Sequence, residues 1–188
     1  PLGGLSKKIT VGTNESGKHM IYRSDRYGFN NPDAEWDSQP IEWLLLGDSF
    51  MNGEAVEPGQ EIAGQLRLIT GNHVISLGIG GNGPLLEYAS LVEYGKKLMP
   101  AKVIWAYFEG NDFFNLNNEK VNPLLMKYME DGFSQNLINR QEDIDTRLGK
   151  YVQSVLNKTL QEREEDIKSQ GNLYNYRWIR LYEVRKLL

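Results

Sequence analysis

Three short groups of glycine and polar residues have side chains that could carry out chemistry. They are Gly47-Asp48-Ser49, the glycine-rich stretch from Gly78 to Gly83, and Gly110-Asn111-Asp112. A serine hydroxyl can attack an acyl group when hydrogen-bond donors stabilise the oxyanion that forms. Backbone N–H groups at glycine and an asparagine amide are suitable donors. Together, the three groups indicate acyl transfer at Ser49.

Each group follows a short apolar run that is typical of a buried parallel strand. These runs cover residues 41–46, 73–77 and 101–108, and helical apolar spacing lies between them at 62–69 and 85–99. The alternation of strands and helices predicts a parallel sheet with right-handed crossovers. Because the carboxyl ends of parallel strands share one edge of the sheet, we expect the three groups to converge there.

The predicted fold class is α/β, with a three-layer α/β/α core of about three parallel strands and a helical C-terminal part. Residues 1–40 would form a hairpin, from runs at 8–13 and 19–23, and an ordered lead-in loop. Residues 41–116 would form the core, and 117–188 a helical segment of the same domain. Within that segment the sequence predicts helices near 117–130, 134–140, 143–168 and 173–188.

The composition narrows the class of protein. The chain has 188 residues, of which 40% are hydrophobic and 24% charged, as expected for one globular domain. Its 25 acidic and 21 basic residues give a net charge of −4, which argues against nucleic-acid binding. The absence of cysteine excludes disulfides and thiolate catalysis, and no apolar run has the length of a transmembrane helix. Neither observation assigns a compartment.

The stretch from Gly78 to Gly83 also matches the dinucleotide-binding pattern G-x-G-x-x-G, which holds a pyrophosphate at a helix N-terminus. Glu109, at the end of the next strand, could reach a ribose. Three points argue against this function. The loop follows the second strand of the unit, Pro84 removes an N–H from the helix start, and the groups around Ser49 and Asn111 stay unexplained. We expect no cofactor, and the spacing of carboxylates and histidines predicts no metal site.

In order and spacing, the three groups resemble the first three sequence blocks of the SGNH (GDSL-type) hydrolase superfamily, over roughly residues 41–112. The resemblance implies a flavodoxin-like fold and esterase, lipase, carbohydrate O-deacetylase or acyltransferase activity. By position it implies that Ser49 is the nucleophile. The oxyanion hole would comprise the N–H groups of Ser49 and Gly81 and the side-chain amide of Asn111. The substrate would be a small-molecule or carbohydrate O-acyl ester.

Neighbouring residues could shape this site or contact the substrate; they are Asp48, Phe50, Gly80, Asn82 and Asp112. The two aspartates would shape their turns, and Gly80 could replace Gly81 as a donor. Aromatic side chains expected near the site could stack on a sugar or line an acyl pocket; they are Phe50, Trp36, Phe113 and Phe114. Ser76 stands where the family usually has asparagine. A small polar side chain at this position can still fix the second loop in place.

The lead-in loop from residue 24 to residue 37 is dense in turn formers. It is interpreted as a connector anchored by its aromatic residues, with a wall of the active site as the alternative. Its stretch 27–32 also resembles the lead-in of an uncharacterised bacterial subgroup.

The resemblance departs from the family at the catalytic base. The family places Asp-x-x-His near its C-terminus, whereas this chain has only His19 and His73, both before the third block. His73 opens a strand at the wrong edge of the sheet and His19 lies in the hairpin, so we expect structural roles for both. The resemblance therefore implies a chain truncated before the Asp-x-x-His block, with little or no turnover. A non-catalytic binding module and an O-acyltransferase are the alternative functions.

The third predicted strand, 101–108, would be internal in the family's sheet of about five strands, yet no strand is predicted beyond it. An open apolar edge is an aggregation hazard. We therefore expect this edge to be covered by the late helices or paired with another molecule, which would allow self-association.

Overall fold

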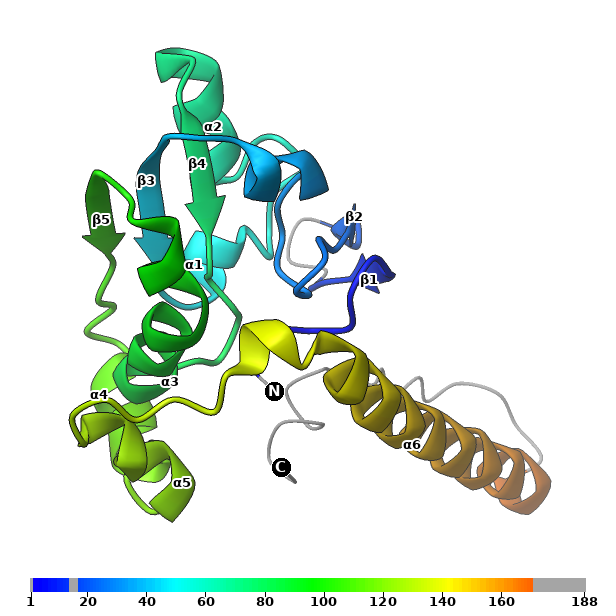
Figure 1. Ribbon diagram of the computed structural model, residues 1–188. Coiled ribbons are helices and arrows are strands. Elements are labelled where there is room, and N and C mark those ends of the chain that lie inside the picture. The colour runs from blue at the N-terminus through cyan, green and yellow to red at the C-terminus, as the bar shows by residue number, and fades with distance from the viewer. Residues whose placement is uncertain (1, 14–16, 171–188) are drawn as a thin grey trace.

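The core of the protein contains a parallel sheet of three strands (Figure 1). The computed structural model describes residues 2–13 and 17–170, with side chains up to residue 163. The strands are β3 (Ile41–Leu46), β4 (His73–Ser76) and β5 (Lys102–Trp105), in the order β4-β3-β5. The first strand of the sheet is therefore flanked by the second and third, as in flavodoxin-like sheets. The predicted α/β class is confirmed.

Helices cover both faces of the sheet. Alternate residues of β3 point to opposite faces, so apolar side chains of this strand pack against helices on both sides. Leu44 and Leu46 pack in the larger core, with Ala89 of α3 (Pro84–Ser90). Leu45 packs on the other face with Ala63 of α2 (Ile62–Thr70). Beyond α3 the chain continues as a π-helical turn, η2 (Leu91–Gly95), and a 3-10 turn, η3 (Lys96–Leu98). The protein is thus layered as helix, sheet and helix.

The C-terminal half is helical but is divided differently from the prediction. It contains α4 (Asp112–Glu119), α5 (Pro123–Met126), η4 (Lys127–Met129), η5 (Leu137–Asn139) and α6 (Gln141–Gln170). The single helix expected over 117–130 is wrong, because the Asn122 side chain accepts the Leu124 N–H at 2.9 Å and starts a new helix at Pro123. The helix expected over 134–140 is reduced to the short turn η5.

The long helix expected over 143–168 is confirmed by α6, and the one expected over 173–188 lies outside the described residues. None of the helices described is both long and apolar enough to cross a membrane.

The N-terminal hairpin and its lead-in loop pack against the core. Strands β1 (Ile9–Val11) and β2 (Ile21–Arg23) pair antiparallel, which confirms the hairpin. The loop that follows includes η1 (Asp33–Asp37) and is organised by Asp25, a fully buried residue. The Asp25 carboxylate accepts four hydrogen bonds, from the N–H groups of Tyr27 and Phe29 and the side chains of Asn31 and Trp36. The interpretation as an aromatic-anchored connector is confirmed.

Side chains of the lead-in loop and α2 close the outer edge of β4. The Asn31 amide donates to the Ser76 carbonyl at 2.9 Å and accepts the Ser76 N–H at 2.8 Å. The Glu35 carboxylate accepts the Val74 N–H at 3.1 Å, and the Arg67 guanidinium donates to the Val74 carbonyl at 2.7 Å. Every outward backbone group of Val74 and Ser76 is therefore bonded.

The outer edge of β5 is open. Because Ala106 N–H donates to Leu46 O, even-numbered residues of β5 face β3, and the backbone groups of Val103 and Trp105 point outward. No hydrogen bond from another described residue reaches those groups. Their side chains are 45% and 42% exposed, respectively. Helix α6 extends away from this edge (Figure 1), so this late helix does not cover it, and the helix expected over 173–188 lies outside the described residues.

Candidate active site

The three loops that follow the strands meet at the carboxyl edge of the sheet. Ile79 N–H donates to Gly47 O at 3.3 Å, which joins the first loop to the second. The Asn111 amide donates to the Asp48 carboxylate at 3.4 Å, which joins the first loop to the third. The three groups singled out in the sequence are therefore neighbours in space.

The first loop turns sharply from β3 into a short helix, α1 (Ser49–Asn52). Gly47 has φ +155°, and a side chain there would come within 2.6 Å of Met51 Cγ. Asp48 is buried and caps α1, since its carboxylate accepts the Phe50 N–H at 3.0 Å. Together these residues fix the direction in which the helix leaves the sheet.

Ser49 is the first residue of α1 and is half-buried. Its carbonyl accepts the N–H groups of Gly53 and Glu54, at 2.9 and 3.2 Å. In the part of the chain that the structure describes, no acceptor bonds to its own N–H or hydroxyl. An N–H at the first turn of a helix has no partner within the helix. The Ser49 N–H therefore remains able to bind an oxyanion.

The second loop places two glycines near the first loop. Gly81 has φ +80° and is exposed, at the centre of a turn closed by Asn82 N–H on Ile79 O at 3.1 Å. Gly80 is half-buried and lies against the Glu54 carboxylate, so that any side chain at position 80 would overlap it. An anionic oxygen therefore already contacts this loop. The sequence had not indicated Glu54.

Ser76 ties the second loop to α1, as the sequence predicted. Its hydroxyl donates to Met51 O at 2.8 Å and accepts the Gly78 N–H at 3.2 Å. Gly78 packs directly on the α1 backbone, where a side chain would come within 2.5 Å of the Met51 carbonyl carbon. The hydroxyl of Ser76 therefore holds the second loop at a fixed distance from the helix that begins with Ser49.

The third loop positions Asn111 at the N-terminus of α4. The Asp112 carboxylate accepts the Phe108 N–H at 2.6 Å and closes the turn, and burial raises its pKa. The Asn111 side chain is held by the bond to Asp48, while its Oδ1 is buried without a partner among the described residues. Because the amide has two N–H donors, one remains available to a substrate.

The remaining predicted contacts fall into two sets. Asp48, Asn82 and Asp112 are all buried, so they support the loops from within. Phe50 is 59% exposed and contacts the Phe108 ring at 5.1 Å between centroids. Exposed aromatic side chains thus lie around the first and third loops; they are Phe50, Phe108, Phe113 and Phe114. The expectation that Trp36 belongs with them is wrong, because its indole is buried against Tyr27 and donates to Asp25.

Neither histidine bonds to Ser49. His73 begins β4 at its amino end, with Nδ1 at 3.4 Å from the Glu35 carboxylate. His19 stays within the hairpin, with Nδ1 at 3.1 Å from Gly12 O. Both histidines therefore lie where the sequence predicted, His73 at the start of a strand and His19 in the hairpin.

The helix N-terminus that a dinucleotide would need is already occupied. The Glu119 carboxylate accepts the Gly83 N–H at 2.6 Å and the Leu85 N–H at 2.9 Å. A pyrophosphate would have to displace this buried carboxylate, which argues further against dinucleotide binding. Across the described residues, no three histidine or acidic side chains are grouped to hold a metal ion.

Glu87 is a second buried carboxylate that the sequence did not reveal. It lies on α3, is fully buried, and accepts the Trp105 indole N–H at 2.5 Å. Its other oxygen has no partner among the described residues. Burial raises the pKa of Glu87 to about 7, and the nearby carboxylates of Asp112 and Asp48 add to the effect. The sequence gave no signal because position 87 lies within an apolar helix, between Leu85 and Tyr88.

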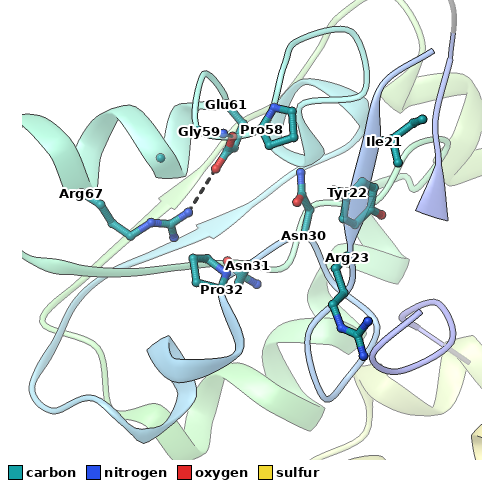
Figure 2. A pocket seen from close by; sticks show the side chains of 11 residues that line it. Ile21, Tyr22, Arg23, Asn30, Asn31, Pro32, Pro58, Gly59, Glu61 and Arg67 are labelled. Atoms are coloured by element: carbon teal, nitrogen blue, oxygen red, sulfur yellow. Dashed lines mark hydrogen bonds and ion pairs between the residues drawn. The ribbon is translucent and has the colours of Figure 1, made fainter. Parts of the chain in front are cut away.

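A hollow of about 440 Å³ lies apart from the three loops, between β2, the lead-in loop and α2 (Figure 2). Arg67 faces Asn30 across it and pairs with Glu61 at 3.1 Å. None of the predicted site residues lines this hollow.

Comparison of the chain with protein-family models, with curated proteins and with solved structures gave no match. The geometry of the three loops is therefore the basis on which a function can be inferred.

Proposed function

We propose that this protein is a serine ester hydrolase of the SGNH type, acting on O-acyl esters through Ser49. The observation that supports the proposal most strongly is the pairing of two donors at one edge of the sheet. The Ser49 N–H has no acceptor among the described residues, and the Asn111 amide lies on the neighbouring loop, bonded to Asp48. An acyl oxygen bound there would meet donors from two loops.

The reaction would proceed through an acyl-enzyme. Ser49 Oγ attacks the ester carbon while a base takes its proton, and the carbonyl oxygen becomes an oxyanion. That oxyanion accepts hydrogen bonds from the Ser49 N–H, the Gly81 N–H and the Asn111 amide. The intermediate collapses and releases the alcohol, and water then cleaves the acyl-serine.

The base is the part of the mechanism that the described residues do not supply. Without a base, a serine hydroxyl is a weak nucleophile near neutral pH. Both histidines are engaged elsewhere, His73 beside Glu35 and His19 in the hairpin. We therefore expect little turnover from the chain alone, and a gain when a small-molecule base is added.

Ester hydrolysis with added imidazole tests the proposal. We expect imidazole to raise p-nitrophenyl acetate hydrolysis by the 188-residue chain above that of Ser49→Ala by roughly tenfold or more, since general-base catalysis contributes at least that much. Subtracting the Ser49→Ala rate removes the reaction of imidazole itself. Ser38→Ala is the matched control, because the half-buried Ser38 follows η1, away from the three loops, and it should behave as wild type. Equal rates for wild type and Ser49→Ala would refute the nucleophile.

A non-catalytic binding module is the second candidate, and the exposed aromatic side chains around Ser49 favour it. Aromatic faces can stack on sugar rings whether or not a reaction follows. Titration of an O-acetylated oligosaccharide into wild type and Ser49→Ala separates the two functions. Equal binding with no Ser49-dependent hydrolysis would support the module. An O-acyltransferase would share the acyl-serine but pass the acyl group to an added alcohol in place of water.

A further inference from the structure

We infer that Asn52, at the end of α1, is a positioning residue that sets the separation of two proposed oxyanion donors. The donors are the N–H groups of Ser49 and Gly81, which lie on the first and the second loop. This role rests on the proposed function, since it concerns how that site is assembled. Because Asn52 is buried, it acts through the loops rather than by contact with the substrate.

Asn52 is 3% exposed and bonds to three separate parts of the chain. Its side-chain amide donates to Gly78 O of the second loop at 3.1 Å. Its backbone N–H donates to Asp48 O of the first loop at 3.0 Å. Its carbonyl accepts the side-chain amide of Asn30, from the lead-in loop, at 2.8 Å. One residue therefore ties the first loop to the second and fastens both to the lead-in loop.

The contact with Gly78 requires a hydrogen-bond donor at position 52. A carbonyl oxygen only accepts hydrogen bonds, so the Asn52 amide presents its N–H to Gly78 O. Gly78 is buried, and among the described residues no other donor reaches its carbonyl. If the amide is removed, a buried carbonyl loses its partner, which is unfavourable. The Asn52 side chain therefore fixes the place of the second loop against α1.

Short paths link Asn52 to both proposed donors. Helix α1 is a single turn that begins with Ser49 and ends with Asn52, and Gly53 N–H donates back to Ser49 O at 2.9 Å. On the other side, Gly78 is three residues before Gly81, and a backbone hydrogen bond closes the turn that contains Gly81. A shift of Gly78 is therefore passed to Gly81. Misplacing a group by about 1 Å can cost about 100-fold in rate.

Ser76 provides a second tie between the same two elements. Its hydroxyl donates to Met51 O at 2.8 Å and accepts the Gly78 N–H at 3.2 Å. Because this tie stays in place when Asn52 is changed, we expect the second loop to shift without unfolding.

The kinetics of Asn52→Ala test this role. With imidazole added, we expect the Ser49-dependent kcat for p-nitrophenyl acetate to fall about tenfold or more, while KM changes by less than about twofold. A misplaced oxyanion donor weakens binding of the transition state, whereas binding of the substrate in its ground state does not depend on it. An unchanged kcat, or a rise in KM alone, would overturn the role.

Two further variants make this test specific. Asn72→Ala is the matched control, because Asn72 is exposed in the turn between α2 and β4, and it should behave as wild type. Asn30→Ala removes the bond to Asn52 O from a half-buried residue at the hollow of Figure 2, so the core should stay intact. We expect a smaller fall in kcat. Should Asn52→Ala fail to fold, Asn30→Ala decides, and a kcat equal to that of wild type would then overturn the role.

Amide hydrogen exchange tests the tie without relying on catalysis. The Ile79 N–H, which joins the second loop to Gly47 O at 3.3 Å, should exchange about tenfold faster in Asn52→Ala than in wild type. The Val74 N–H, bonded to Glu35 at the outer edge of β4, should not change. Unchanged exchange at Ile79 would overturn the role. If wild type shows no Ser49-dependent hydrolysis, the proposed function fails, and exchange at Ile79 alone decides whether Asn52 holds the second loop.

Discussion

The two outer edges of the same sheet are built in opposite ways. At β4, side chains from elements far apart in the sequence bond every outward backbone group of Val74 and Ser76. At β5, the corresponding groups of Val103 and Trp105 are bonded by no described residue, and apolar side chains are exposed. Since both edges belong to short parallel strands, the difference lies in what the rest of the chain brings to them.

The loops of the candidate site also differ in how close they lie to the closed and the open edge of the sheet. The loops carrying Ser49 and Gly81 lie on the closed side, where Ser76 and Asn31 connect the sheet to the lead-in loop and to α1. Asn111 follows β5, on the open side. Ser49, the proposed nucleophile, is therefore held by a completed framework, while Asn111, a proposed oxyanion donor, depends on a strand with only one described neighbour.

The largest effect expected from breaking the closed edge is that of Asn31→Ala. The substitution leaves the N–H and carbonyl of Ser76 unbonded and removes one donor from the buried Asp25 carboxylate. Each buried group left without a partner costs about 1–3 kcal/mol, so we expect the free energy of unfolding to fall by about 3 kcal/mol. Urea denaturation measures this change.

Asn118→Ala serves as the matched control, because Asn118 is exposed on α4. This substitution should change the free energy of unfolding by no more than about 0.5 kcal/mol. If Asn31→Ala lowers the free energy of unfolding by less than about 1 kcal/mol, water or rearranged side chains must replace the hydrogen bonds from Asn31 to Ser76. The contrast between the two edges would then disappear.

A smaller effect is expected on the open side, from Glu87 beneath Trp105. Burial raises the pKa of Glu87 from 4.5 to about 7, so the folded protein binds this proton more tightly than the unfolded chain. The resulting stabilisation is complete below pH 4.5 and is lost as the pH rises through 7. The full stabilisation amounts to about 3 kcal/mol, because each pKa unit corresponds to about 1.4 kcal/mol. Glu87→Gln keeps an acceptor for the Trp105 indole but removes the titration.

Urea denaturation at pH 5 and pH 8 checks this expectation. Between pH 5 and pH 8, the free energy of unfolding of wild type should fall by about 2 kcal/mol more than that of Glu87→Gln. Other buried carboxyl groups with raised pKa, such as Asp25 and Asp112, titrate in both proteins and largely cancel in the comparison. Equal losses in the two proteins would show that Glu87 already finds a compensating partner.

The sheet could be predicted from sequence because its signals are local. The apolar run from Ile41 to Leu46 ends in turn residues, and Gly71 ends α2 with φ +68°. The break before Pro123 was also visible, as an asparagine cap followed by proline, but it was missed. The start of α4 at Asp112 was hidden, because this residue also closes the turn of the third loop.

The contacts that distinguish the two edges could not be predicted in this way. Asn31 reaches Ser76 across 45 positions, and Glu119 reaches Gly83 across 36. No periodicity links residues so far apart, and an asparagine in a turn-rich loop looks the same whether or not it caps a strand. The grouping of Ser49, the second loop and Asn111 was predictable because parallel strands place their carboxyl ends together.

Covalent trapping at Ser49 tests the proposed chemistry most directly. The chain is treated with an alkyl fluorophosphonate in the presence of imidazole, and the modified residue is identified by peptide mass spectrometry. The account predicts one phosphonylated residue, Ser49, with labelling slowed in Asn111→Ala because the oxyanion loses a donor. Labelling spread over exposed serines, or equal labelling of wild type and Ser49→Ala, would contradict it.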